Sequence, residues 1–219
     1  MNVAHLEHCA TPKLSHNAVD SIFCAGMAGY NELVDIIQAI DRFFLNLLTS
    51  LGGETEVRDQ VVYTLAQMLP YVFVLAALWL FFAGRTKAQK EKNQNTVLIV
   101  LGATLLAIGL RWLIGGAFER DRPFLTYPDL HHVALPGTDN TAFPSGHALI
   151  LFTVASVIYF LGKHPKLAWT LLFIAGVVAL ARVTAGVHYP TDILGGALLG
   201  IGLARLVTWQ TEWADKQLK

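Results

Sequence analysis

Charge is scarce in this chain of 219 residues, because only 15% of them are Asp, Glu, Lys or Arg. A soluble domain carries roughly 25% charged residues. Sixteen basic residues are balanced by sixteen acidic ones, so no net positive field would recruit nucleic acid, and nucleic acid is not an expected partner. With 54% hydrophobic residues, the composition excludes a disordered chain and an ordinary cytosolic domain. It predicts an integral membrane protein.

Cysteine is also scarce. The chain has two, Cys9 and Cys24, which excludes a disulfide-rich small domain. A single disulfide between them is one interpretation, and a pair of free thiols is the favoured one. Three histidines lie in the same stretch, but their spacing matches no zinc-binding pattern. We interpret residues 1–30 as a poorly ordered extension.

Long apolar runs occupy most of the remaining chain. The segment 61–83 is uncharged and long enough for the ~20 residues of a membrane helix, with a predicted kink at Pro70. Four further runs are shorter, so each predicted helix must continue into polar flanking residues to cross the ~30 Å hydrocarbon core. These runs are 96–110, 148–161, 167–181 and 193–203.

An amphipathic helix is predicted before the first span. Apolar residues recur at three-and-four spacing from Leu33 to Leu51, and the helix lies either in the membrane interface or against the bundle. The predicted fold class is therefore all-α: an integral membrane helical bundle of about five transmembrane helices plus this helix. We divide the chain into an extension (1–30), a membrane domain (31–208) and a cytoplasmic tail (209–219).

Basic residues cluster in alternate connections. Lysines and arginines follow the first span, separate the third from the fourth, and follow the fifth. An up-and-down path places these three clusters on one side of the membrane, which the positive-inside rule assigns to the cytoplasm. The connections 115–146 and 182–192 then face outward.

The outward connections carry ionisable groups, which a membrane protein otherwise avoids near its spans. Where such groups gather on one membrane face, a functional site is expected there. The candidate site residues in the first connection are Arg120, Arg122 and His147, together with Ser145 and Gly146 next to His147. Those in the second are Arg182, His188 and Asp192.

Phosphate is the ligand that these groups fit. Ser145 is a suitable N-cap, and Gly146 would let an anion approach backbone N–H groups at the positive end of a helix. His188 and Asp192 are four positions apart, so the carboxylate can fix the imidazole tautomer and leave the other nitrogen free to attack. Each element also has a plainer interpretation, as a turn, a helix cap or a structural ion pair.

Three blocks of these residues resemble the signature of the type 2 phosphatidic acid phosphatase superfamily. They are Arg-Pro at 122–123, Pro-Ser-Gly-His at 144–147 and Arg-x5-His-x3-Asp at 182–192. The stretches 69–71 and 186–190 further resemble the bacitracin-resistance branch, whose members are undecaprenyl-diphosphate phosphatases. The resemblance covers about 61–207 at the level of topology.

The resemblance implies hydrolysis of a lipid phosphate through a phosphohistidine, with no metal and no other cofactor. His188 would attack phosphorus while Asp192 holds the imidazole ring in place. His147 would protonate the departing oxygen and then act as the base that activates water. The groups that neutralise the phosphoryl oxygens would be Arg122, Arg182, Ser145 and Gly146.

One position departs from the family pattern. The superfamily has a lysine seven positions before the arginine of the first block, and this chain has Gly115 there. Arg111 lies one helical turn earlier on the same face, which makes it a candidate phosphate ligand, as is Arg120. Alternatively, Arg111 pairs with an acidic residue such as Glu119 in a structural role.

The expected substrate is a lipid phosphate at the outer face of the bacterial inner membrane. The branch implies conversion of undecaprenyl diphosphate to undecaprenyl phosphate for cell-wall synthesis, with phosphatidate, phosphatidylglycerol phosphate and lipid A phosphate as alternatives. A phosphotransferase and a non-catalytic lipid carrier or channel are the other classes considered. His131 and His132 lie in the same outward connection, and we interpret them as solvated rather than metal-binding.

Overall fold

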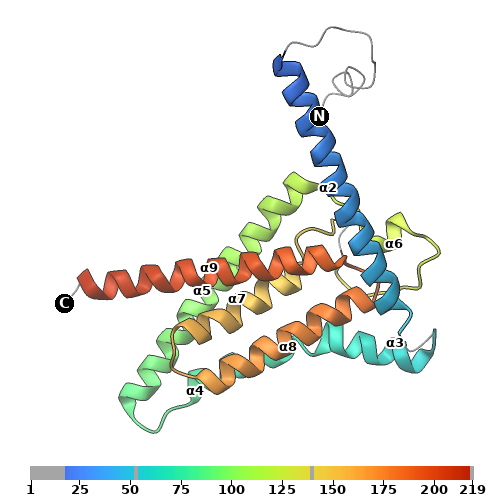
Figure 1. The fold of residues 1–219 in the computed structure, drawn as a ribbon. Coiled ribbons are helices and arrows are strands. Elements are labelled where there is room, and N and C mark those ends of the chain that lie inside the picture. The colour runs from blue at the N-terminus through green and yellow to red at the C-terminus, as the bar shows by residue number, and fades with distance from the viewer. Residues whose placement is uncertain (1–17, 52–53, 139–140, 218–219) are drawn as a thin grey trace. The chain divides into compact units, whose positions relative to one another are not determined.

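The computed structural model describes residues 18–51, 54–138 and 141–217. Within these ranges the regular secondary structure is helical, apart from an isolated bridge between Asp121 and Thr141. The contacts within the chain divide it into two units, one up to Phe43 and one from Phe44 onward. Figure 1 shows the helices as ribbons. The predicted all-α class is confirmed.

The predicted amphipathic helix is longer than its apolar pattern. Helix α2 (Ala18–Thr49) begins inside the segment 1–30 that we predicted as a poorly ordered extension. Residues 18–30 therefore belong to a helix, whereas 1–17, including Cys9 of the possible disulfide, lie outside the described residues.

The second unit contains the helices that form the bundle. Prolines stand at the first position of α6, α8 and α9, where a missing N–H costs no hydrogen bond. Thr86 caps α5, because its Oγ1 accepts a hydrogen bond from the N–H of Gln89 at 3.2 Å. The segments are α3 (Glu56–Tyr63), the π-helical η1 (Thr64–Met68), α4 (Tyr71–Phe82), α5 (Lys87–Phe118), α6 (Pro123–Thr126), α7 (Gly146–Phe160), α8 (Pro165–Thr184) and α9 (Pro190–Gln217).

Four stretches of the described chain are long and apolar enough to cross a membrane: Glu56–Phe82, Lys87–Phe118, Pro165–Thr184 and Pro190–Ala214. Large apolar side chains on their outer faces are exposed, among them Trp112, Leu113, Phe173 and Leu198. In water such surface would be unfavourable, whereas lipid tails accommodate it. The molecule is a membrane protein.

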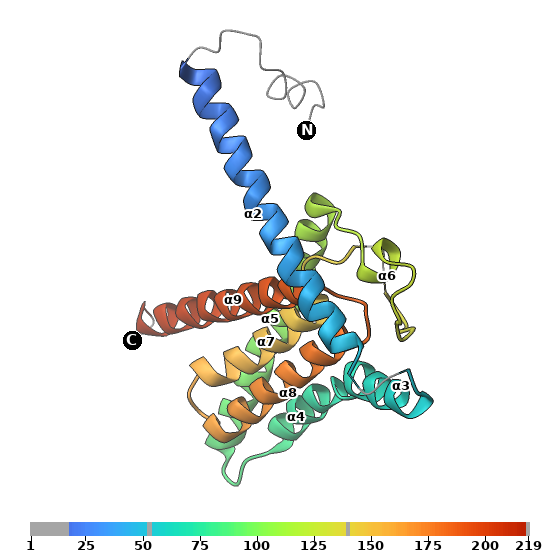
Figure 2. The same ribbon diagram turned by 45° about the vertical axis from the view of Figure 1, so that its right-hand side comes forward.

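The remaining predicted span, α7, is a short central helix. We expected every short apolar run to continue into its polar flanks, as α5 and α9 do, but α7 has only 15 residues, or about 22 Å. Nine of these residues are buried. They pack against α5, α8 and α9, which surround α7 (Figure 2).

The first span is interrupted where the sequence predicts a kink. The N–H of Leu69 donates to the carbonyl of Thr64, five residues earlier, at 3.0 Å, and Pro70 follows at once. A π-helical turn of this kind is a common cause of a bend in a helix.

Glycines allow α9 to approach α7 closely. A Cβ on Gly196 would lie 2.7 Å from the carbonyl oxygen of Ser145, and one on Gly200 would lie 2.5 Å from that of Leu149. The hydroxyl of Thr153 donates to the carbonyl of Gly200 at 3.3 Å. Small residues four apart are typical of tightly packed membrane helices. This packing places the start of α7 beside the start of α9.

The connections meet in pairs at the two ends of the bundle, as an up-and-down path requires. Asn93 donates to the carbonyl of Ala83 at 3.1 Å, and its Oδ1 lies 2.9 Å from Nε2 of His164. At the other end, the N–H of Val133 donates to the carbonyl of Ala185 at 3.0 Å. The two predicted outward connections therefore lie against each other.

Replacing Gly200 tests the helix contact. We expect Gly200→Ala to lower the free energy of unfolding by about 1–3 kcal/mol, because the added methyl group meets backbone atoms that cannot move aside. Thermal unfolding in detergent measures the effect. Gly202→Ala is the matched control, since a Cβ there meets no atom within 4 Å. An equal loss in both variants would contradict the proposed contact.

Candidate active site

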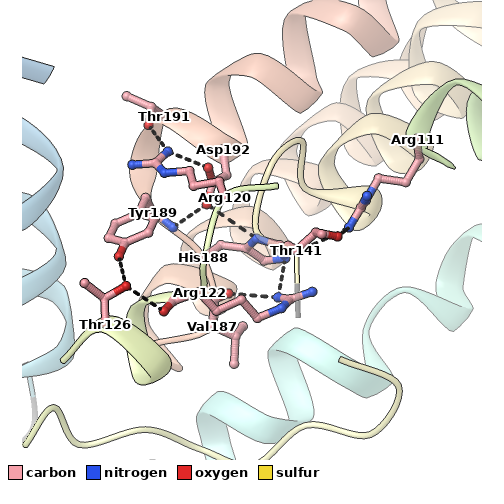
Figure 3. A network of polar contacts seen from close by, with 10 residues as sticks. All are labelled: Arg111, Arg120, Arg122, Thr126, Thr141, Val187, His188, Tyr189, Thr191 and Asp192. Atoms are coloured by element: carbon pink, nitrogen blue, oxygen red, sulfur yellow. Dashed lines mark hydrogen bonds and ion pairs between the residues drawn. The ribbon is translucent and has the colours of Figure 1, made fainter. Parts of the chain in front are cut away.

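The residues singled out by the sequence converge where α7 and α9 begin. His188 lies in the connection before α9, Arg122 directly precedes α6, and Arg182 lies in the last turn of α8. Each of these side chains is at most 3% exposed. Together with His147 and Arg111 they line a cavity of about 570 Å³. Figure 3 shows the polar contacts around this site.

His188 faces Arg122 with one of its ring nitrogens. The Nη1 of Arg122 lies 3.2 Å from Nε2 of His188 and also donates to the carbonyl of Val187 at 2.8 Å (Figure 3). Because arginine has only donors, Nε2 of His188 acts as the acceptor and carries a lone pair. Arg122 therefore orients the imidazole, and its positive charge lies beside the nitrogen that an anionic substrate would approach.

The imidazole of His188 is neutral at pH 7. Its burial lowers the pKa well below the ordinary value, and the positive charges of Arg182 and Arg122 lower it further. A neutral imidazole is the form that acts as a nucleophile or as a base.

Asp192 is fully buried behind His188. Its Oδ2 accepts from the N–H of Tyr189 at 2.8 Å, and its Oδ1 accepts from Arg120 at 2.6 Å. Its Oδ2 lies 3.7 Å from Nδ1 of His188, which is longer than a hydrogen bond. His188 and Asp192 are thus neighbours without a hydrogen bond between them, and Tyr189 and Arg120 hold the carboxylate.

Arg120 is a partner of Asp192, so its predicted role as a phosphate ligand stays a prediction. Its Nη1 donates to Asp192 and, at 2.8 Å, to the hydroxyl of Thr191. The guanidinium also lies 4.0 Å from the ring centroid of Tyr189. Arg120 is absent from the described residues that line the cavity. It neutralises a buried carboxylate.

The start of α7 presents Gly146 and His147 to the cavity. Ser145 stands at the N-cap position, but its hydroxyl makes no capping hydrogen bond, and its N–H donates to the carbonyl of Asp192 at 3.1 Å. The N–H of Ser145 is thus already used, whereas its hydroxyl is buried without a hydrogen-bond partner among the described residues, so phosphate binding by Ser145 stays a prediction for the hydroxyl. The first N–H groups of a helix lack intrahelical partners, so Gly146 and His147 remain the candidates for contact with an anion.

Arg111 extends from α5 to the cavity, as the sequence predicts. Its Nη2 donates to the carbonyl of Thr141 at 3.1 Å and to its hydroxyl at 2.9 Å (Figure 3). A Cβ on Gly115 would overlap Nη1 of Arg111. The guanidinium thus occupies the space that a side chain at position 115 would take. No signal in the sequence indicated Thr141 as its partner.

In the predicted outward connection, His132 is exposed as expected, whereas His131 is half-buried and has a side-chain partner. Nε2 of His131 lies 3.0 Å from Oδ1 of Asp59, and the ring of His132 stacks on Phe124 at 5.2 Å between centroids. Among the described residues, no group of three or more His, Cys, Asp or Glu side chains is arranged around a possible metal position.

Comparison with known proteins agrees with this geometry. The PAP2 superfamily profile matches residues 96–216. This chain belongs to the PAP2 superfamily. It is 33% identical over 170 residues to the bacitracin transport permease protein BcrC of Bacillus licheniformis, covering 78% of this chain and 79% of that protein.

Two further relatives of this PAP2 chain come from Bacillus subtilis. The undecaprenyl-diphosphatase BcrC is 25% identical over 154 residues, which covers 69% of this chain and 74% of that protein. The crystal structure of a transmembrane PAP2 type phosphatidylglycerolphosphate phosphatase matches with a TM-score of 0.61 at 25% identity, over 84% of this chain and 88% of that one. The resemblance to this superfamily is confirmed, and the protein is a membrane lipid phosphatase.

The lowered pKa of His188 predicts how stability depends on pH. The unfolded chain protonates this histidine as the pH falls below 6.5, whereas the folded protein does not, so its contribution to stability is lost below that pH. We expect a loss of up to about 1.4 kcal/mol per pH unit from this residue. Thermal unfolding of wild type and His188→Gln between about pH 7.5 and 5 measures it. The variant should show a shallower dependence, and equal slopes would contradict the prediction.

Proposed function

We propose that this PAP2 phosphatase hydrolyses the terminal phosphate of a lipid diphosphate at the outer face of the bacterial inner membrane. Undecaprenyl diphosphate, converted to undecaprenyl phosphate, is the substrate that we favour. The proposal depends on the chemistry of the cavity wall, because the described residues that line it include three arginines and no acidic side chain. Such a wall fits an anion.

The same cavity has an apolar part. Phe73, Val100, Ile150 and Val154 line it from α4, α5 and α7. A ligand with a charged head and a hydrocarbon tail fits both parts at once. The basic connections at the opposite end of the bundle support an outward-facing site.

The chemical step begins with His188. Its Nε2 forms a bond to the terminal phosphorus, the bond from phosphorus to the bridging oxygen breaks, and the lipid monophosphate departs. Arg122 lies beside the attacking nitrogen, and Arg111 and Arg182 also line the cavity. Their charges would neutralise the oxygens of the transferred group, which is the main source of catalysis in phosphoryl transfer.

His147 serves as the acid and then as the base. Burial and the nearby arginines disfavour the protonated form of His147 before substrate binds, so we infer that it takes up a proton when the negatively charged substrate enters, and it then donates that proton to the departing oxygen. It then takes a proton from the water that attacks the phosphohistidine, which releases inorganic phosphate and restores His188. Asp192, 3.7 Å from Nδ1 of His188, stabilises the positive charge that the ring acquires when it is phosphorylated.

Relatives support two lipid substrates. One B. subtilis relative is named an undecaprenyl-diphosphatase, and a B. subtilis structural relative is a phosphatidylglycerolphosphate phosphatase. Phosphate release from undecaprenyl diphosphate, phosphatidylglycerol phosphate and phosphatidate by the purified protein distinguishes them. We expect the highest kcat/KM for undecaprenyl diphosphate. Inorganic phosphate as the product, with or without an acceptor lipid, would exclude phosphate transfer to lipid.

Replacing the two histidines tests their roles. We expect His188→Ala to lower turnover by about 10³-fold or more, and His147→Ala to lower it by about 10²–10⁴-fold. A substrate with an acidic leaving group should partly restore the His147→Ala variant, because no proton is then needed at the departing oxygen. His164→Ala, at the opposite end of the bundle, is the control and should retain activity. Full activity of His188→Ala would contradict the mechanism.

Arg111 is proposed to perform the task of the missing lysine. We expect Arg111→Ala to lower kcat/KM by about tenfold to a hundredfold, since a hydrogen bond to a charged group contributes about 1.5–3 kcal/mol. The double variant Arg111→Ala/Gly115→Lys should recover part of the loss, because the guanidinium fills the space beside Gly115. Normal kinetics per folded molecule with poor expression of Arg111→Ala would show a structural role instead.

A further inference from the structure

Gln67 is a polar residue of the cavity wall that the mechanism does not use. It lies in the π-helical η1, which interrupts the first span, and it lines the same cavity as His147 and Arg182. Its Oε1 is buried and has no hydrogen-bond partner among the described residues. A buried polar atom without a partner is unfavourable, and π-helical turns are frequent at functional sites. These two observations point to a ligand contact.

Gln67 stands at the junction of the two parts of the cavity. Its own segment η1 packs against α8, the helix that ends near Arg182. Immediately after it, α4 begins and contributes Phe73 and Val74 to the apolar wall. Gln67 thus shares the cavity with both the basic and the apolar lining residues.

We propose that the Gln67 amide binds the phosphate that remains on the lipid after hydrolysis of a lipid diphosphate, an inference that rests on the proposed function. The transferred phosphate is placed at His188 by the attack on phosphorus, beside Arg122. In a diphosphate, the second phosphate lies behind it on the side of the tail, which is the side of the apolar wall. Phosphate oxygens accept hydrogen bonds, so this contact requires the amide to turn about its terminal torsion until Nε2 takes the place of the buried Oε1.

This contact makes Gln67 a residue that determines specificity. A lipid monophosphate has carbon where the diphosphate has its second phosphate, so the amide gains no hydrogen bond from it. A site that contains a buried hydrogen-bonding group discriminates against a ligand that leaves the group without a partner. Gln67 would therefore favour diphosphates over phosphate monoesters.

Farnesyl diphosphate and farnesyl monophosphate test the inference, because they share one tail and differ by one phosphate. We expect Gln67→Leu to lower kcat/KM for the diphosphate by about tenfold or more and for the monophosphate by less than about threefold. Gln67→Glu, which keeps the shape but adds a negative charge, should reduce the diphosphate rate further. Gln60→Leu is the matched control, because Gln60 is exposed on α3 and lies outside this cavity.

The outcomes separate this inference from the proposed function. A wild-type protein that releases phosphate from neither compound overturns the proposed function. With an active wild type, an equal loss for both substrates in Gln67→Leu, at unchanged thermal stability, shows a role unrelated to the second phosphate and overturns the inference. Unchanged kinetics for both substrates also overturn it.

Discussion

The close contact between α7 and α9 determines how the groups at the starts of these two helices lie relative to one another. Gly196 and Gly200 bring the backbones of the two helices together, and the N–H of Ser145 then reaches the carbonyl of Asp192 at 3.1 Å. The start of α7 carries His147, and His188 stands just before α9. A side chain between the helices would separate the proposed acid from the proposed nucleophile.

The second constraint is the cost of burying charged side chains. Asp192 and the arginines of the cavity wall are the charges concerned. Asp192 is fully buried, and Arg120 compensates it at 2.6 Å. A buried carboxylate without a cation would be strongly unfavourable, so the contact with Arg120 stabilises Asp192. The described residues that line the cavity include Arg111, Arg122 and Arg182 and no acidic side chain. A wall of this charge would suit the phosphate group of the proposed substrate.

Much of this architecture was predictable because its signals are local in the sequence. Scarce charge and long apolar runs predict the membrane bundle, and the three blocks predict the residues around His188. The contact of Arg120 with Asp192 was not predictable, because it joins residues 72 positions apart. Nor did any local pattern indicate that Gln67 lines the cavity. The contact through Gly196 and Gly200 was missed as well, since one sequence does not reveal which helix faces a small-residue pair. The short length of α7 was not predictable either. Its neighbours α5, α8 and α9 bury it, and the spacing of apolar residues does not show which helix will be central.

Detection of the covalent intermediate tests the central claim most directly. Wild-type protein is mixed with farnesyl diphosphate, quenched in alkali to preserve phosphohistidine within the first turnover, digested, and analysed by mass spectrometry. The account predicts a phosphoryl group on the peptide that contains His188, formed together with farnesyl monophosphate and before inorganic phosphate. A phosphoryl group on another residue, or turnover with simultaneous release of both products and no labelled peptide, would contradict it.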